Sequence, residues 1–160
     1  MLNYYAWGVI ADLDGKSVHI GGEEVQHALL SRYLVKSGYQ VTSLVGDFGQ
    51  RAVEHVDGVR VRKTFALGAG LPGLRFFTPR MSSTWRALRE ADADVYYASC
   101  AGAMVGVMAA FCRRHRRRFV FRIASDADCA PHTLMVNNTR DRMLYHYGLH
   151  RADRILAQTR

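Results

Sequence analysis

The sequence predicts an α/β fold in which a mostly parallel β-sheet carries helices on both faces. Short apolar runs alternate along the chain with longer stretches of helical periodicity, which is the order typical of β-α-β units. In addition, the 160 residues are 49% apolar and 22% charged, so the chain can bury a core. A chain of this length normally forms one domain. We therefore expect residues 1–160 to form a single domain.

Six short runs have the composition of β-strands. Each is four to seven residues long, mostly rich in β-branched or aromatic residues, and lies between polar or turn-forming residues. In chain order they are Tyr4–Ile10, Gln40–Val45, Val59–Lys63, Asp94–Ala98, Phe119–Ala124 and Arg154–Ala157. The pair Asp57-Gly58 is expected to form a turn before the third of them. We expect at least five of these strands to share one sheet.

Four segments have the periodicity of helices. Glu23–Ser37 is the clearest, because its apolar side chains fall on one face, as in an amphipathic helix; they are Val25, Ala28, Leu29, Leu30, Tyr33 and Leu34. Acidic residues in its first turn and Lys36 in its last turn suit the helix dipole. The other predicted helices are Ser82–Glu90, Ala101–His115 and Asn138–Leu149. The Gly- and Pro-containing segment Gly68–Pro79 is expected to be a loop.

The net charge restricts the expected partners, and the cysteines restrict the expected cellular compartment. A formal net charge of +8 favours anionic partners: nucleic acid, acidic lipid or phosphorylated small molecules. Sequence patterns of the common nucleic-acid-binding modules are missing, so no nucleic acid is expected. The longest weakly polar run, Ala101–Cys112, is shorter than the ~20 residues that a bilayer requires. The three cysteines form no C-x-x-C pair, and the N-terminus carries no visible secretory signal. Both observations indicate a cytoplasmic protein. Peripheral contact with the inner face of a membrane is compatible with them.

Gly21 and Gly22 stand directly before the first predicted helix. Glycines let a backbone come close to a phosphate, and the free N–H groups of a helix N-terminus attract an anion. The sequence lacks the G-x-G-x-x-G pattern of dinucleotide-binding folds. Two interpretations are therefore open for this pair: a structural turn or a phosphate-binding loop.

Three segments together resemble the glycosyltransferases of family 4, which act with retention of configuration. The first runs through Ile20-Gly-Gly-Glu-Glu-Val-Gln to Gly38-Tyr-Gln-Val-Thr and is similar to the family's G-G-x-E motif, helix and following strand. The second, Ala93-Asp94-Val95-Tyr96-Tyr97, looks like its P-D-V strand. The third, Arg151-Ala152-Asp153-Arg154-Ile155-Leu156-Ala157, looks like its A-D strand. The resemblance covers nearly the whole chain.

The resemblance implies the N-terminal, acceptor-side half of a GT-B enzyme, in which two Rossmann-like domains face each other across a cleft. It implies that Gly21, Gly22, Glu24 and Ser125 contact the donor diphosphate or the acceptor. The C-terminal domain that binds the nucleotide-sugar is expected in the full-length protein and is absent from these residues. The expected partners are therefore a nucleotide-sugar donor, shared with that second domain, and a sugar or lipid-linked acceptor. No cofactor is expected.

The end of the fifth predicted strand departs from the family pattern. Many members carry a sugar-contacting His there, whereas this chain reads Ser125-Asp126-Ala127-Asp128. Because sites on parallel sheets form at the carboxyl ends of strands, Asp126 or Ser125 could occupy that position, and Asp126 is our candidate for the catalytic residue. The same four residues contain a D-x-D pattern, which can hold a metal ion against a diphosphate. That pattern occurs twice more, at Asp12/Asp14 and Asp92/Asp94, so we expect a polar loop and no metal site.

Five arginines lie within six residues at the end of the third predicted helix: Arg113, Arg114, Arg116, Arg117 and Arg118. Cations suit a helix C-terminus, so a solvated helix end is one interpretation. Docking to an anionic membrane surface is the other, because each clustered cation contributes ~1 kcal/mol near such a surface. The aromatic residues Trp7 and Trp85 have two interpretations as well, as core residues or as a platform on which an acceptor sugar stacks.

Two functions from different classes follow. The first is a retaining glycosyltransferase, for which this chain alone is expected to be inactive because half of the site is missing. The second is a non-catalytic Rossmann-like module that binds a phosphorylated ligand or an acidic surface. A reading frame of about 350–400 residues would favour the enzyme, on ordinary domain sizes. We expect no protein nucleophile, since the sequence offers no activated Ser or Cys.

Overall fold

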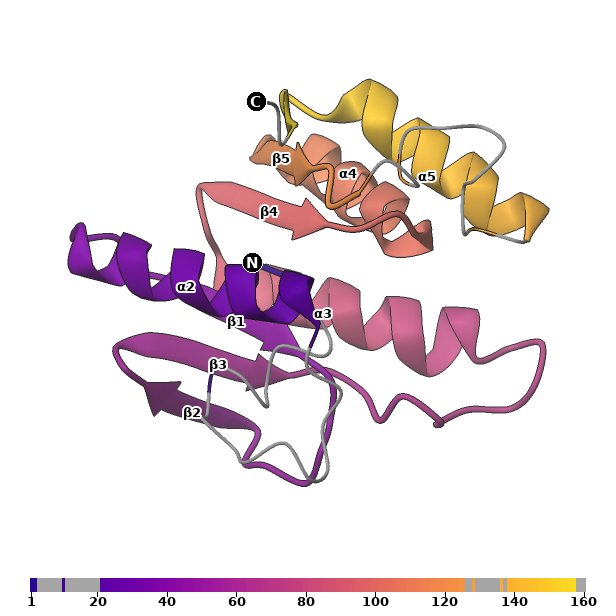
Figure 1. The fold of residues 1–160 in the computed structure, drawn as a ribbon. Coiled ribbons are helices and arrows are strands. Elements are labelled where there is room, and N and C mark those ends of the chain that lie inside the picture. Colours follow the sequence, from indigo (N-terminus) through magenta and orange to yellow (C-terminus); the bar gives the residue numbers. More distant parts are fainter. Residues whose placement is uncertain (3–9, 11–20, 126–127, 129–135, 137, 158–160) are drawn as a thin grey trace. The chain divides into compact units, whose positions relative to one another are not determined.

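The computed structural model describes residues 1–2, 10, 21–125, 128, 136 and 138–157 (Figure 1). The chain divides into two compact units, Met1–Ala91 and Asp92–Arg160. Each unit combines helices with parallel strand pairs, so the predicted α/β class is confirmed. The predicted strand Tyr4–Ile10 lies outside the described residues except for Ile10. A single domain over residues 1–160 stays a prediction.

The first unit contains a three-stranded sheet in the order β1-β3-β2. β1 (Thr42–Val45) runs parallel to β3 (Val59–Lys63), and β2 (Val53–Val56) runs antiparallel to β3. The turn between β2 and β3 is the predicted Asp57-Gly58, where both residues have positive φ. β2 itself was not among the predicted strands. The two middle residues of this strand, Glu54 and His55, are polar, and the strand lies at the edge of its sheet.

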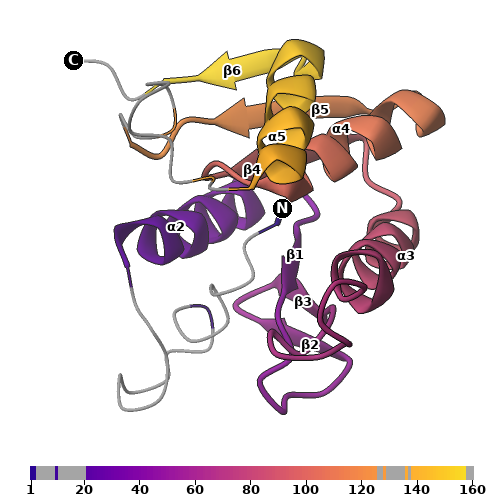
Figure 2. The ribbon, with the colours of Figure 1, turned by 90° about the vertical axis from the view of Figure 1, so that its right-hand side faces the viewer.

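Two helices cover opposite faces of this sheet, α2 (Gly22–Lys36) and α3 (Ser82–Ala91) (Figure 2). Both were predicted within one residue at each end. A short helical segment, η1 (Phe76–Met81), precedes α3 and is kinked at Thr78. The segment predicted as a loop, Gly68–Pro79, therefore ends in helical structure.

Helix α2 buries three polar side chains and exposes three apolar ones. Val25, Leu29 and Tyr33 are 37%, 58% and 66% exposed, whereas Glu24, His27 and Ser31 are buried. The buried groups are bonded: His27 Nε2 lies 2.8 Å from Ser43 Oγ, and the Ser31 hydroxyl donates to the His27 carbonyl. The amphipathic interpretation of this helix was therefore wrong at Val25, Leu29 and Tyr33. It is confirmed at Ala28, which belongs to the core, and at Leu34, which is partly buried and packs against that core.

The second unit is parallel throughout, with the strand order β4-β5-β6. Its strands are β4 (Val95–Ser99), β5 (Arg118–Arg122) and β6 (Arg154–Leu156). Helix α4 (Ala103–His115) connects β4 to β5, and α5 (Thr139–Arg151) precedes β6. All five elements lie within two residues of their predicted bounds. The six strands of the described residues thus form two three-stranded sheets, and a single sheet of five or more strands stays a prediction.

Helices α4 and α5 lie side by side at very short range (Figure 1). A Cβ atom on Gly106 would lie 2.2 Å from the carbonyl oxygen of Leu144, and one on Gly148 would lie 2.8 Å from the Val105 carbonyl carbon. Only glycine fits at these two positions. The contact holds Tyr145 in the core, where its ring meets the edge of Phe121 at a centroid distance of 5.7 Å.

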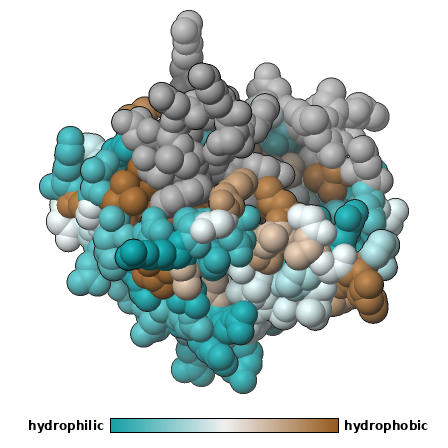
Figure 3. Space-filling model, turned by 90° about the horizontal axis from the view of Figure 1, so that it is seen from below, coloured by the Kyte–Doolittle hydropathy of each residue, from teal (hydrophilic) through white to brown (hydrophobic). Residues whose placement is uncertain are grey.

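The surface seen in Figure 3 is mainly hydrophilic, and its apolar side chains lie in separate small patches. Scattered apolar residues of this kind are normal on a protein surface. Among the described residues, no helix has both the length and the apolar character needed to cross a bilayer.

Candidate functional site

The pair Gly21-Gly22 forms the N-terminus of α2. Gly21 is extended (φ −105°, ψ 171°) and is the N-cap, so the helix begins at Gly22. The Gly21 N–H donates to Glu24 Oε2 at 2.8 Å, and Glu24 is only 8% exposed. Glu24 therefore fixes the first turn of its own helix. Its carboxylate is held by the backbone where the resemblance implies a contact with the substrate.

The two glycines have different surroundings. A Cβ atom on Gly21 would lie 2.6 Å from Glu24 Oε2, so the absence of a side chain makes room for that carboxylate. A Cβ atom on Gly22 would meet no described atom within 4 Å. Gly21 thus has a structural role in the first turn, whereas no described atom fills the space beside Gly22.

The chemistry available at this helix end is hydrogen-bond donation from the backbone. A glycine N-cap has no side chain to accept bonds from the first turn, and such N–H groups suit a phosphate oxygen. Glu23 and Glu24 place negative charge in the same turn, which weakens the attraction of the helix dipole for an anion. Close backbone approach at Gly22 is therefore the main source of affinity that this geometry offers.

In the second unit, Asp128 organises the loops that follow β4 and β5. Its Oδ2 accepts from the Ala124 and Ser125 N–H groups at 2.7 and 3.1 Å, and its Oδ1 accepts from the Ala101 N–H at 3.1 Å. The Tyr145 hydroxyl donates to the Asp128 carbonyl at 2.8 Å. Both carboxylate oxygens are therefore engaged by backbone donors.

The three polar residues that the sequence analysis singles out after β5 are Ser125, Asp126 and Asp128. Ser125 is exposed at the turn that Asp128 closes. Asp126, the candidate catalytic residue, lies outside the described residues. Asp128, the second carboxylate of the D-x-D pattern, holds the loop together. No local sequence pattern predicts this role, because the N–H groups that Asp128 binds come from two separate loops.

We expect Asp128→Ala to lower the free energy of unfolding by about 3 kcal/mol, because it leaves three N–H groups without their acceptor in a half-buried loop. Asp128→Asn keeps one acceptor oxygen and is expected to cost less. Urea unfolding of both variants measures the difference. If Asp128→Ala lies within about 1 kcal/mol of the parent, the carboxylate does not hold the loops together.

The arginine cluster separates into one paired and four exposed side chains. Arg117 bonds Asp92 Oδ1 at 2.6 Å and Asp94 Oδ1 at 3.1 Å. Arg113, Arg114, Arg116 and Arg118 are exposed. Arg116 adopts the left-handed conformation that ends α4 (φ 54°). The surface available to a partner therefore consists of four arginines, whereas Arg117 is paired with two nearby carboxylates.

The two described cysteines differ in exposure. Cys112 is buried in α4, and burial raises the pKa of its thiol to about 12. A thiol with so high a pKa stays protonated at neutral pH and is a poor nucleophile. Cys100 is exposed in the loop after β4 and has positive φ (67°).

Helices combined with parallel strand pairs define a Rossmann-like α/β protein. Residues 20–160 match the sequence model of Glycosyltransferase Family 4. The chain belongs to this family and is a glycosyltransferase domain. No curated protein matches the chain.

Proposed function

We propose that the chain is the N-terminal, acceptor-side domain of a glycosyltransferase that moves a sugar from a nucleotide-sugar to an acceptor with retention of configuration. The observation that carries this proposal is that no described atom lies within 4 Å of the Cβ position of Gly22, at the N-terminus of α2, in a member of a glycosyltransferase family. Polysaccharide or glycolipid synthesis is the process that we propose for the enzyme, in the cytoplasm.

In this proposal the Gly22 end of α2 faces the diphosphate of the donor. As the sugar leaves, negative charge grows on the diphosphate, and backbone N–H groups of the first turn stabilise it. Ser125 and Asp126, which follow β5, supply polar contacts to the sugar. A C-terminal domain outside these residues binds the nucleotide. No residue of this chain acts as a covalent nucleophile.

The direct experiment is to incubate the product of the complete reading frame with a panel of nucleotide-sugars and acceptors. Release of the nucleoside diphosphate reports transfer, and the anomeric configuration of the product, read by NMR, reports retention. Transfer with inversion would contradict the retaining mechanism. No transfer with any sugar of the panel would favour a binding module.

We further propose that the four exposed arginines at the end of α4 contact an anionic membrane surface where the acceptor is lipid-linked. The four arginines lie within six residues and are exposed, and the neighbouring acids Asp92 and Asp94 are paired with Arg117. Exposed charges are screened over ~10 Å at 0.1 M salt, so this contact is expected to weaken as salt rises.

Changing Arg113, Arg114 and Arg118 together to Gln is expected to weaken binding to acidic-lipid vesicles about 100-fold, since each cation contributes ~1 kcal/mol. Vesicle co-sedimentation at several salt concentrations measures this. The matched control changes three exposed arginines elsewhere, Arg51, Arg75 and Arg142, and so removes the same charge. Equal losses of vesicle binding in the two triple variants would mean that net charge alone governs binding. If the unaltered protein does not bind the vesicles, the cluster is only a solvated helix end.

A further inference from the structure

Three large apolar side chains are exposed in the segment that connects β3 to α3. Leu71 is 71% exposed, Leu74 is 61% exposed and Phe77 is 50% exposed. Their spacing of three residues is that of neighbours on helical turns. Isolated apolar residues are ordinary on a protein surface, whereas these three lie within one short segment. We refer to Leu71, Leu74 and Phe77 together as the 71–77 surface.

The segment that carries the 71–77 surface is anchored to its unit by other side chains. Phe76, which lies between exposed neighbours, is buried. The Arg80 guanidinium lies over the ring of Phe65, 5.9 Å from its centroid, and its Nη2 donates to the Leu67 carbonyl at 3.1 Å. The exposed apolar side chains therefore belong to a segment that already has its own core contacts.

Four backbone N–H groups of this segment are bonded within it. Those of Leu74 and Arg75 donate to the Leu71 carbonyl at 3.1 and 2.8 Å. Those of Phe77 and Thr78 donate to the Leu74 carbonyl at 2.9 and 3.1 Å. An N–H group without a partner is costly in an apolar medium. These turns can therefore enter such a medium without leaving the four groups unbonded.

The sequence around the 71–77 surface carries positive charge and no acid. Residues 64–89 contain no Asp or Glu and four arginines, Arg75, Arg80, Arg86 and Arg89. Apart from Arg80, which packs on Phe65, these arginines are exposed. A surface of this kind attracts anionic partners.

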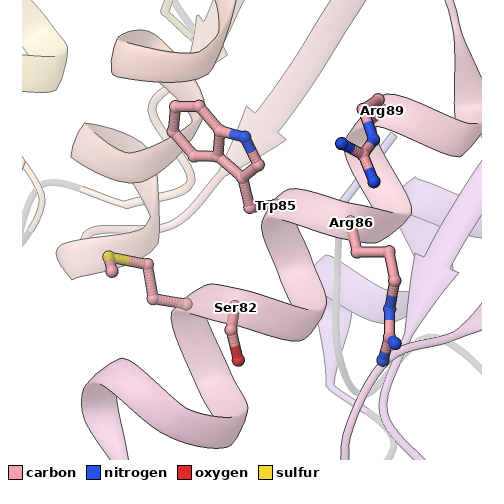
Figure 4. Close-up of a pocket in the computed structure, with 5 residues that line it drawn as sticks. Ser82, Trp85, Arg86 and Arg89 are labelled. Atoms are coloured by element: carbon pink, nitrogen blue, oxygen red, sulfur yellow. The ribbon is translucent and has the colours of Figure 1, made fainter.

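The two exposed arginines of α3 do not form a binding site for a small anion. A hollow of about 300 Å³ on this helix is lined by Met81, Ser82, Trp85, Arg86 and Arg89 (Figure 4). Figure 4 shows Arg86 on the other side of α3 from Trp85 and Arg89, and Trp85 is half-buried. The positive charge is therefore spread around the helix, which suits an extended anionic surface better than one small ligand.

We propose that the 71–77 surface inserts into the apolar boundary of an anionic membrane, with Arg75 at the lipid headgroups and the arginines of α3 adding attraction at longer range. Leu and Phe side chains beside cations are typical of segments that lie in a membrane interface. A stable protein–protein interface requires roughly 20–30 residues from each partner, far more than the three side chains of this surface. The proposal concerns a different unit from the arginine cluster at the end of α4, and it does not depend on sugar transfer.

Replacing Leu71, Leu74 and Phe77 together by Gln in the product of the complete reading frame is expected to weaken vesicle binding at least tenfold. The reason is that the apolar area buried in the bilayer is lost, while the net charge is unchanged. Co-sedimentation with vesicles of phosphatidylcholine and phosphatidylglycerol measures the affinity, and thermal melting checks that the variant is folded.

The matched control replaces three exposed apolar side chains of α2, Val25, Leu29 and Tyr33, by Gln and is expected to bind as the unaltered protein does. Salt separates insertion from charge attraction, because salt screens exposed charges and leaves apolar burial in place. The tenfold difference between the variant and the unaltered protein is therefore expected to persist over the whole salt range in which the unaltered protein binds.

Phe77→Trp gives a second measurement that does not rely on loss of binding. Vesicles with brominated acyl chains are expected to quench the emission that this indole adds to that of the unaltered protein. The proposal is overturned if no added emission is quenched, if the α2 control loses as much binding, or if the unaltered protein does not bind the vesicles. It is also overturned if the triple variant only converts a dimer into a monomer, because the surface would then join two copies. None of these results bears on sugar transfer, which the release of nucleoside diphosphate measures separately.

Discussion

Replacing Gly22 by Val in the complete enzyme is expected to lower kcat/KM for sugar transfer by about two orders of magnitude, which is the effect of losing one donor to a developing oxyanion. The branched side chain would occupy the open space at the N-terminus of α2 and keep the diphosphate from the backbone N–H groups. The domain should stay folded, because no described atom lies within 4 Å of the new Cβ position and Gly22 is the first residue of the helix.

Gly68→Val is the matched control. Gly68 also has no described atom within 4 Å of its Cβ position and no positive φ, and it lies in a turn of the same unit. Thermal melting of both variants checks that each is folded. If folded Gly22→Val retains the activity of Gly68→Val, the glycine pair is only a turn, and the phosphate-binding role is wrong.

Gly106→Val is expected to give the largest loss of stability, about 3 kcal/mol or more, since an added side chain overpacks the contact between α4 and α5. The first atom of that side chain would lie 2.2 Å from a backbone oxygen, which cannot move aside as a side chain can. The two helices would have to separate, and the core around Tyr145 would open with them. Urea unfolding measures the loss.

Gly102→Ser is the control in the same unit. Gly102 is the N-cap of α4, its Cβ position is open, and its φ of 168° is extended backbone that any residue adopts. A serine there also offers an oxygen that caps the helix. We expect no loss of stability in this variant. A Gly106→Val protein as stable as Gly102→Ser would contradict the close helix contact.

Most elements could be predicted from local pattern. β3 has its predicted bounds. Val59 and Val61 alternate with polar residues as in a strand, and the turn residues Asp57-Gly58 predict where the strand begins. β2 could not be predicted in the same way. It is half-exposed at a sheet edge, so its inner residues are free to be polar, and its pairing with β3 defines it as a strand.

The buried face of α2 could not be predicted from hydrophobicity. The unit buries Glu24, His27 and Ser31 because each finds a hydrogen-bond partner in the fold: Gly21, Ser43 and the His27 carbonyl. Two of these partners lie within one or two turns of the same helix, but Ser43 comes from β1. A pattern rule assigns polar residues to the outside and cannot anticipate such pairing.

The candidate site was predictable in part. The motif located the glycine pair, but which glycine is structural depends on where the Glu24 carboxylate lies. Likewise, the five arginines within residues 113–118 look equivalent in the sequence, yet the side chain of Arg117 is paired with Asp92 and Asp94. The role of Asp128 could not be predicted from the sequence either, because the three N–H groups that it binds come together only when two loops meet.

We propose that residues 1–160 hold only half of the active site. The most direct test compares residues 1–160 with the product of the complete reading frame. The measurement is the release of nucleoside diphosphate from nucleotide-sugars in the presence of acceptor. Catalysis requires donor and acceptor to be held together, and we propose that a second domain holds the donor nucleotide. The expected result is turnover by the complete protein and none by residues 1–160. Turnover by residues 1–160 alone would contradict the proposal, because this chain would then hold a whole site.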